Sequence, residues 1–298
     1  MQLAIIGVPV DLGANRRGTD MGPSAVRYAG LNHHLKTMGF TVYDLGNIDV
    51  PIPETTRIKD PRLKYLEEIV KMAETLATKV EHVLLLGHFP LVIGGDHSIS
   101  LGTLTGLARV KPGAGLIWID AHGDFNTLET TLSGNIHGMS LSAIVGRGHP
   151  ALVNCGNSSP KVAEQHTVLV GVRDLDPEER LLLKASNVTV FTMQNIDELG
   201  IAAVMQQAMR IAGQAGQGFH VSFDMDVLDT EVVSGVGTPV FGGITYREAH
   251  LAMELVARSR QLVSLELVEV NPILDRGGNI TAQLAVELAC SALGKTIF

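Results

Sequence analysis

The sequence predicts an α/β domain built on a buried, doubly wound parallel sheet, and two observations lead to this prediction. Short apolar runs alternate with segments of helical period along the 298 residues. Most of these runs are continuously apolar, as expected for strands that are covered on both faces of a parallel sheet. Strand–helix alternation of this kind is typical of doubly wound folds. Because no repeat, low-complexity tract or linker interrupts the pattern, residues 1–298 are predicted to form a single domain.

The individual elements follow from apolar runs, helical period and capping residues. The runs predicted to be strands are residues 3–8, 41–45, 91–93, 116–119, 167–172, 188–192, 219–223 and 262–268. The segments predicted to be helices are residues 23–38, 62–86, 196–211 and 246–257. Pro23 suits a first helical turn because its φ is fixed, and Thr245 and Glu248 have the spacing of a capping box. Three Gly- and Pro-rich stretches remain as long loops, which are uncommon unless functional: residues 46–60, 123–138 and 229–243.

Composition limits the classes of partner and the compartment. The formal net charge is −8 and hydrophobic residues make up 45%, so a large core is expected and no basic face for nucleic acid or an anionic membrane is predicted. The amino terminus lacks the features of a signal peptide, and no apolar stretch has the length of a membrane span. Cys155 and Cys290 are not in a metal-binding or redox spacing, so we expect buried free thiols and a cytoplasmic protein.

Polar residues with metal-binding side chains follow four of the predicted strands, always at the carboxyl end. In open parallel sheets, ligands bind beyond this end of the strands. The sequence therefore delivers acids and imidazoles from distant segments to one edge of the sheet: Asp96 and His97, Asp120, His122 and Asp124, Asp224 and Asp226, and Glu269.

The spacing of these residues predicts a pair of metal ions. Alternate residues on an extended chain point to the same side, so Asp120, His122 and Asp124 can face one centre, as can Asp224 and Asp226. Together with His97 they provide four carboxylates and two imidazoles, which is too many ligands for one tetrahedral zinc. A single Asp after a strand is usually a helix cap or a turn former, but the set forms a specific constellation. Oxygen-rich ligation with some imidazole favours Mn, Fe or Co over Mg.

Two neighbouring metals can hold a water molecule and lower its pKa, which makes hydroxide available near neutral pH. The atom attacked would be a carbonyl carbon, a phosphoryl phosphorus or a guanidinium carbon, and the ligand residues alone do not decide among them. No phosphate-binding loop or basic cluster stands near these strand ends. Arg173, which precedes Asp174 and Asp176, is predicted to be an ion-pair partner.

Motifs spread over nearly the whole chain carry a family resemblance. They are GVPVDLG (7–13), RRGTDMGPSAVR (16–27), GGDHS (94–98), DAHGDFNT (120–127), SGNIHGM (133–139), SFDMDVLD (222–229), GVGTP (235–239) and EVNP (269–272). In this order they resemble the ureohydrolase family. DAHGDFNT together with SGNIHGM is most similar to the arginases of bacteria, with Asn126 and Ser133 as the telling residues.

The resemblance implies a three-layer αβα sandwich around an eight-stranded, mostly parallel sheet, a homotrimer or homohexamer, and two Mn²⁺ ions per subunit. It implies that His97, Asp120, Asp124 and Asp224 hold one ion, and that His122, Asp120, Asp224 and Asp226 hold the other. The implied reaction is the cleavage of L-arginine to L-ornithine and urea by a metal-bridging hydroxide that attacks the guanidinium carbon.

The remaining site residues also follow from the resemblance. It implies that His137, Glu269 and the ligand Asp124 are catalytic, with His137 as a proton shuttle and Glu269 holding the guanidinium group. It further implies that Asn126 and Ser133 meet the substrate carboxylate. Asp176 is expected near the α-amino group, and Thr238 is expected in the pocket wall.

Three residues depart from the usual family pattern: Ser140, where Pro often stands, Val227 in place of Gly, and Thr230 in place of Pro. None is a predicted ligand, although Val227 adds bulk beside Asp226. Other readings remain: an agmatinase or guanidino-acid hydrolase, a formiminoglutamate hydrolase, or an inactive binding protein on the same fold. Asn126 and Ser133 argue against the first of these, and the intact ligand set argues against the last.

Overall fold

The core of the molecule is one eight-stranded sheet with the strand order β2-β1-β3-β8-β7-β4-β5-β6. The computed structural model describes residues 1–157 and 159–296. Every pairing between named strands is parallel, and each predicted strand corresponds to one of them. The strands are β1 (Gln2–Val8), β2 (Thr41–Asn47), β3 (Phe89–Gly94), β4 (Gly115–Ile119), β5 (Thr167–Val172), β6 (Thr189–Thr192), β7 (Phe219–Asp224) and β8 (Leu262–Val268).

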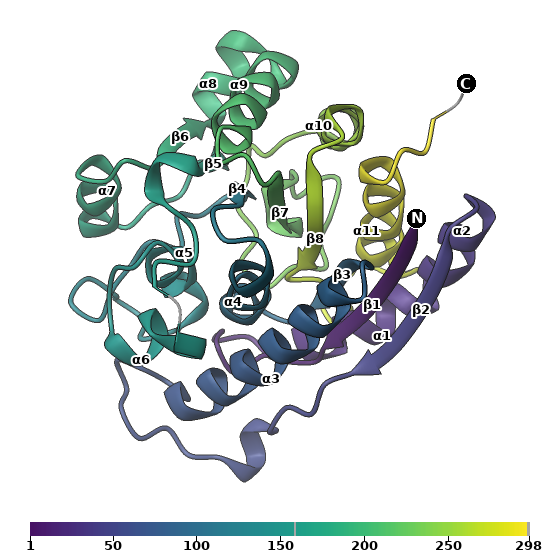
Figure 1. Cartoon of the computed structure of the whole chain (residues 1–298). Helices are drawn as coiled ribbons and strands as arrows, with labels where there is room; N and C mark the ends of the chain where they lie inside the picture. Colours follow the sequence, from purple (N-terminus) through teal and green to yellow (C-terminus); the bar gives the residue numbers. More distant parts are fainter. Residues whose placement is uncertain (158, 297–298) are drawn as a thin grey trace.

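Helices cover both faces of the sheet, which confirms the predicted three layers (Figure 1). Along β1, Leu3 and Ile5 pack into one hydrophobic core while Ala4 and Ile6 pack into the other. The helices on the first side are α1 (Gly22–Tyr28), α2 (Leu31–Thr37), α8 (Met193–Leu199), α9 (Ile201–Gly213), α10 (Tyr246–Ser259) and α11 (Ile280–Ala292). Those on the second side are α3 (Leu66–Leu85), α4 (Ser100–Val110), α5 (Ser140–Ile144), α6 (Pro150–Val153) and α7 (Pro177–Lys184).

Three of the four predicted helices needed correction at glycines or at their start. The segment 23–38 is two helices, because Gly30 has a φ of 93° that a helix interior does not allow. The segment 196–211 starts earlier, at Met193, and is broken at Gly200, whose φ is 80°. The segment 62–86 becomes helical only at Leu66, after Tyr65 in the left-handed region. The helix 246–257 is confirmed, with its capping box between Thr245 and Glu248.

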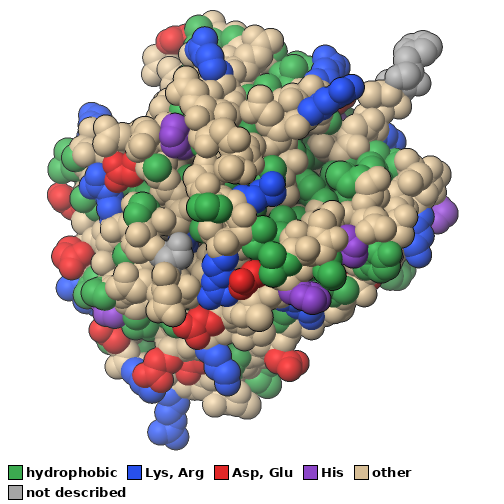
Figure 2. Space-filling view, in the orientation of Figure 1, with side chains coloured by type: hydrophobic (Ala, Val, Ile, Leu, Met, Phe, Trp, Pro, Cys, Tyr) green, Lys and Arg blue, Asp and Glu red, His purple; other side chains and the backbone are tan. Residues whose placement is uncertain are grey.

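Helices α4 and α11 were not predicted, and their burial explains why. Both are buried on nearly all sides, so neither has the alternating polar face that marks a surface helix. Cys155 and Cys290 are buried free thiols, as predicted. No helix in the described part of the chain is long and apolar enough to cross a membrane. On the face that carries α3 and α4, lysine and arginine side chains are scattered among acidic ones (Figure 2).

The sheet order brings the four strands with polar ends into adjacent positions. Strands β3, β8, β7 and β4 are neighbours at the centre of the sheet, so their carboxyl ends meet at one edge. The segments that follow these strands carry the predicted site residues, which therefore converge although up to more than half of the chain separates them in sequence.

Candidate metal centre and active site

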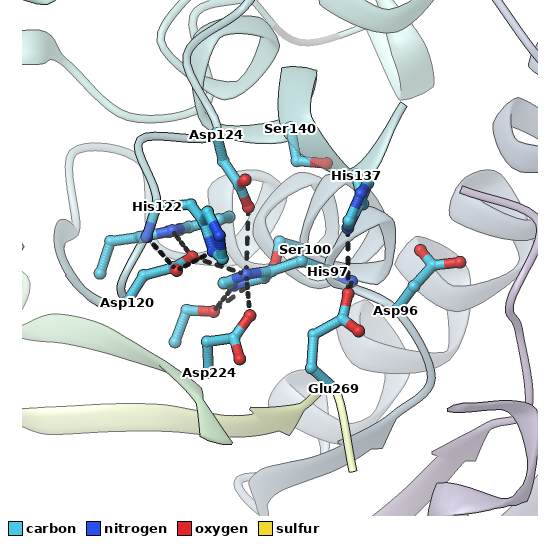
Figure 3. A network of polar contacts seen from close by, with 12 residues as sticks. Asp96, His97, Ser100, Asp120, His122, Asp124, His137, Ser140, Asp224 and Glu269 are labelled. Atoms are coloured by element: carbon cyan, nitrogen blue, oxygen red, sulfur yellow. Dashed lines mark hydrogen bonds and ion pairs between the residues drawn. The ribbon is translucent and has the colours of Figure 1, made fainter. Parts of the chain in front are cut away.

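The first group of metal-competent side chains surrounds His97. This residue follows β3 and begins the short helix η3 (His97–Ile99), whose cap is Asp96. Its Nδ1 atom lies 3.1 Å from Oδ2 of Asp120, 3.1 Å from Oδ2 of Asp124 and 3.0 Å from Oδ2 of Asp224. Figure 3 shows the imidazole at the centre of these three carboxylates. Three strand ends thus deliver one nitrogen and three oxygens to a single buried point.

The second group is built around His122 and shares a residue with the first. Nδ1 of His122 lies 3.1 Å from Oδ2 of Asp226 and 3.5 Å from Oδ1 of Asp120. Each of the two groups can hold a metal ion, the first through His97, Asp120 and Asp224 and the second through Asp120, His122 and Asp226. Asp120 turns one oxygen to each histidine, an arrangement suited to two ions that share a bridging carboxylate. The identity of the metal is not fixed by this geometry.

Buried polar atoms without partners and unusual backbone angles both occur at the predicted site residues. Among the described residues, Nδ1 of His97 and Oδ2 of Asp124 are buried and have no hydrogen-bond partner. Such orphaned atoms are costly unless a bound ion satisfies them. Asp124 and Glu269 also have φ values of 49° and 64°, in the left-handed region that costs free energy for residues with a side chain. Strain of this kind is concentrated at functional sites.

The electrostatics of the cluster reflect crowded negative charge. Burial, together with repulsion from Asp226 and Asp120, raises the pKa of Asp224 well above its ordinary value. Burial alone would lower the pKa of His97, but the close carboxylates of Asp120, Asp124 and Asp224 raise it well above its ordinary value. Four carboxylates need about four positive charges for compensation, and two divalent cations supply that number.

A second acid–imidazole pair lies beside the cluster. Nδ1 of His137 is 3.1 Å from Oε1 of Glu269, which also accepts a 3.0 Å hydrogen bond from the backbone N–H of His97. Burial lowers the pKa of His137, but Glu269 outweighs it and raises this pKa to about 9. The other carboxylate oxygen of Glu269 is buried and has no hydrogen-bond partner within the described chain. Glu269 therefore keeps an acceptor available next to the metal positions.

A cavity of about 230 Å³ opens above these residues. Its walls hold His122, Asp124, His137 and Asp224 together with four of the five predicted substrate-binding residues: Asn126, Ser133, Asp176 and Thr238. Glu269, the fifth, is buried and is not among the residues that line this cavity. Oδ2 of Asp176 accepts a 3.0 Å hydrogen bond from the amide of Asn126, while Oδ1 of Asn126 accepts one from Thr130. The hydroxyl of Thr238 donates to Asp226 over 2.8 Å, so this residue holds a predicted ligand as well as forming the wall.

Comparison with known proteins identifies the family of the protein that carries this site. The sequence model of the Arginase family matches residues 1–294. The arginase of Brevibacillus brevis is 50% identical over 98% of this chain and 97% of its own length. The chain belongs to the arginase family. It is accordingly an enzyme, a hydrolase, and the family resemblance drawn from the sequence motifs is confirmed.

Solved arginase structures share the fold. The arginase of Bacillus caldovelox superposes with a TM-score of 0.96 at 48% identity, covering 100% of this chain and 99% of that one. An arginase of Entamoeba histolytica in complex with L-ornithine gives a TM-score of 0.89 at 29% identity, with 98% of each chain covered. The sandwich and its sheet are thus those of arginases across the full length of the described chain.

The residues that depart from the family pattern lie outside the two histidine–carboxylate groups. Ser140 is buried at the start of α5, where its hydroxyl donates to the carbonyl of Ile136. Val227 is fully buried, and a β-carbon added to Gly171 would lie 2.5 Å from its Cγ2 atom. Its added bulk therefore packs over a glycine. The structure gives no particular role to Thr230.

Arg173 corrects one expectation for this arginase-family site. It was predicted to form an ion pair, but its guanidinium group donates to backbone carbonyl oxygens instead. These include the carbonyls of Asp226 and Val240, each at 2.8 Å. Arg173 thereby ties the segment after β7 to the loop that carries Thr238. The acidic residues that follow Arg173 in the sequence suggested an ion pair, whereas the carbonyl groups that it contacts belong to segments distant in the sequence.

Some cavity residues were not singled out in the sequence, although one of them, Asn135, lies within the motif SGNIHGM (133–139) recognised there. Asn15 and Asn135 line the cavity, and the ammonium group of Lys64 bridges their side chains with 3.0 Å hydrogen bonds to each. Glu179 lies on the opposite wall and accepts hydrogen bonds from the backbone N–H groups of Phe125 and Asp176. Its position three residues after Asp176 is the capping-box spacing, which was the available signal.

Proposed function

We propose that this enzyme hydrolyses L-arginine to L-ornithine and urea with two Mn²⁺ ions in each subunit. The observation that carries the proposal is the pair of histidine–carboxylate groups sharing Asp120, in a member of the arginase family. The complex of the Entamoeba histolytica relative with L-ornithine, an amino acid, supports a substrate of the same class.

The donor atoms fit a pair of ions. We assign His97, Asp120, Asp124 and Asp224 to one ion, and His122, Asp120, Asp224 and Asp226 to the other. Mixed oxygen and imidazole ligation suits Mn²⁺, and the absence of thiolates from both groups disfavours a soft metal. When bound, such a pair lowers the pKa of water and supplies the nucleophile near neutral pH.

The side chains around the cavity would orient the substrate along its length. Glu269, whose Oε2 atom is buried and unpaired within the described chain, would accept from the guanidinium group. At the other end, the Asn126 amide and the Ser133 hydroxyl offer donors for a carboxylate, and Asp176 offers an acceptor for an ammonium group. Both ends of arginine thus find groups of complementary charge or hydrogen-bonding character.

His137 would move the proton that the reaction requires. Its side chain is 15% exposed and lines the cavity, while its Nδ1 atom faces Glu269. An imidazole in this position can exchange protons with the cavity and with solvent while Glu269 holds its orientation. Asp124 is a proposed metal ligand that also lines the cavity, so we count it with His137 and Glu269 among the catalytic residues.

The alternatives within metal hydrolase chemistry differ in the substrate end remote from the metals. An agmatinase has no substrate carboxylate to bind, whereas Asn126 and Ser133 provide donors where one is expected. We further propose that residues 1–298 act as one catalytic domain in a cytoplasmic homotrimer or homohexamer. The free thiols support the compartment, and one continuous sheet supports the single domain.

Metal depletion and reconstitution test the proposal. Exhaustive chelation should abolish urea release from arginine, and Mn²⁺ should restore it with about two ions bound per chain. Mg²⁺ serves as the matched control ion because it disfavours imidazole ligands. Full activity after chelation, or active protein without any transition metal by elemental analysis, would overturn the metal assignment.

A further inference from the structure

A fully buried polar chain lies behind His97, on the side of the ring opposite the three carboxylates. Nε2 of His97 is 2.8 Å from the hydroxyl of Ser222, and this hydroxyl donates to Oε1 of Glu266 over 2.7 Å. The hydroxyl of Ser100 donates to the same oxygen. Ser222 on β7 and Glu266 on β8 are register partners in adjacent strands. The hydrogen-bonded side chains of His97, Ser222 and Glu266, here called the relay, therefore run from the metal centre into the middle of the sheet.

Glu266 is unusual because it is a carboxylate on a central strand with no solvent exposure. Burial would raise its pKa, but His220, 3.4 Å away, and the neighbouring hydroxyls lower it to about 2. Glu266 is thus ionised at neutral pH despite its location. Apolar residues normally fill such strand positions, because it is costly to bury a charge.

The hydrogen-bond directions in this chain determine the tautomer of His97. An ionised Glu266 only accepts, so the single hydrogen of the Ser222 hydroxyl points to it. The Ser222 oxygen is then left to accept from Nε2–H of His97. A neutral imidazole that is protonated at Nε2 presents a lone pair at Nδ1, which is the atom facing Asp120, Asp124 and Asp224. Trp118 stacks on the ring at 3.9 Å and holds its plane.

We propose that Glu266 is a positioning residue of the metal centre, which acts through Ser222 to fix the His97 tautomer with Nδ1 available to a metal ion. This inference rests on the proposed function, because it assigns His97 to a metal. Residues that orient a ligating histidine in this way typically contribute about 10- to 100-fold to metal affinity. Glu266 touches neither substrate nor metal, so its effect should appear in metal binding first.

Two variants interrupt the hydrogen bonds of the relay, one at Ser222 and one at Glu266, and a third variant serves as the control. Ser222→Ala removes the acceptor for His97, and Glu266→Gln removes the charge while keeping the shape. Thr167→Val is the matched control: Thr167 is equally buried at the start of β5, and its hydroxyl donates to the carbonyl of Ala163 over 3.0 Å. Thermal unfolding of all three variants separates loss of strand stability from loss of metal affinity. Ser222→Thr keeps the hydroxyl and should rescue binding.

The measurements are Mn²⁺ titration of metal-depleted protein and steady-state kinetics of the reloaded protein on arginine. We expect Ser222→Ala and Glu266→Gln to weaken Mn²⁺ binding about 10- to 100-fold relative to Thr167→Val. Activity should recover at saturating Mn²⁺ with an unchanged KM for arginine.

The outcomes separate this proposal from the proposed function. If the unmodified protein binds two Mn²⁺ ions and both Ser222→Ala and Glu266→Gln bind them as tightly as Thr167→Val, the positioning role is overturned while the proposed function stands. If the unmodified protein binds no Mn²⁺, the proposed function is overturned. In that case the positioning role, which requires a metal ion at His97, is overturned with it.

Discussion

Nδ1 of His137 lies 3.1 Å from Oε1 of Glu269, so a histidine at the cavity wall is joined to a buried acid at the end of β8. His137 belongs to neither histidine–carboxylate group. His137→Ala should therefore keep the metal content and lower kcat by about 10²- to 10⁴-fold, the usual contribution of a proton-transfer group. Steady-state kinetics and elemental analysis test this. His82→Ala, on the exposed side of α3, is the control. Unchanged kcat with normal metal content would make His137 a structural loop residue.

Asp120 faces both histidines, whereas Asp226 faces only His122. Asp120→Ala should accordingly weaken both metal positions, because it removes a shared oxygen donor from each and leaves the other charges uncompensated. Asp226→Ala should weaken the position near His122 and spare the other. Counting metal ions per chain after dialysis distinguishes the two variants. Equal loss in both would contradict a bridging role for Asp120.

Asn126 connects the cavity wall to Asp176 through a 3.0 Å hydrogen bond, and an amide has a second hydrogen for a substrate carboxylate. Asn126→Ala should raise the KM for arginine and narrow the preference for arginine over agmatine. Agmatine lacks the carboxylate and acts as the internal control, since its own KM should change little. A parallel loss for both substrates would mean that Asn126 only maintains the loop.

Much of this site was predictable because parallel strands bring their carboxyl ends to one edge. His97, Asp120, His122, Asp224 and Asp226 each stand within a few residues of a strand end, so the topology alone assembles them. The inner strands were found because both of their faces are buried, which leaves continuous apolar runs, whereas the edge strands β2 and β6 are exposed or half-buried.

Other features depend on contacts between distant segments and left no local signal. The bridge from Lys64 to Asn15 and Asn135 joins three loops, and the carbonyl cluster around Arg173 is invisible in side-chain identities. The breaks at Gly30 and Gly200 were missed because a glycine within a helical pattern is often tolerated, and only its observed φ decides. The Ser222–Glu266 pairing required the strand register.

Lys161 gives the protein a pH-dependent stability that is independent of the metal centre. Burial lowers the pKa of its ammonium group from 10.5 to about 8, and Nζ donates to the carbonyl of Val153 over 2.8 Å. Below about pH 8 the folded protein carries the full cost of the buried charge, and that cost disappears as the pH rises to about 10.5. This contribution therefore makes the protein more stable with rising pH across that window.

Lys161→Met should remove the dependence. The free energy of unfolding of the unmodified protein, relative to the variant, should increase by up to about 3 kcal/mol between about pH 7.5 and about pH 10.5. Urea unfolding at the two pH values measures this difference. A difference that stays constant with pH would show that Lys161 titrates at its ordinary pKa in the folded protein.

The central claim is that the cavity selects arginine by its α-carboxylate and cleaves its guanidinium group. Urea release by the Mn²⁺-loaded protein, measured as kcat/KM on arginine, agmatine and guanidinobutyrate, tests it most directly. We predict that arginine is preferred by about 10⁴- to 10⁵-fold, because the donors at Asn126 and Ser133 are left unpaired by a substrate without the carboxylate. Comparable kcat/KM on arginine and agmatine would contradict this account of the site.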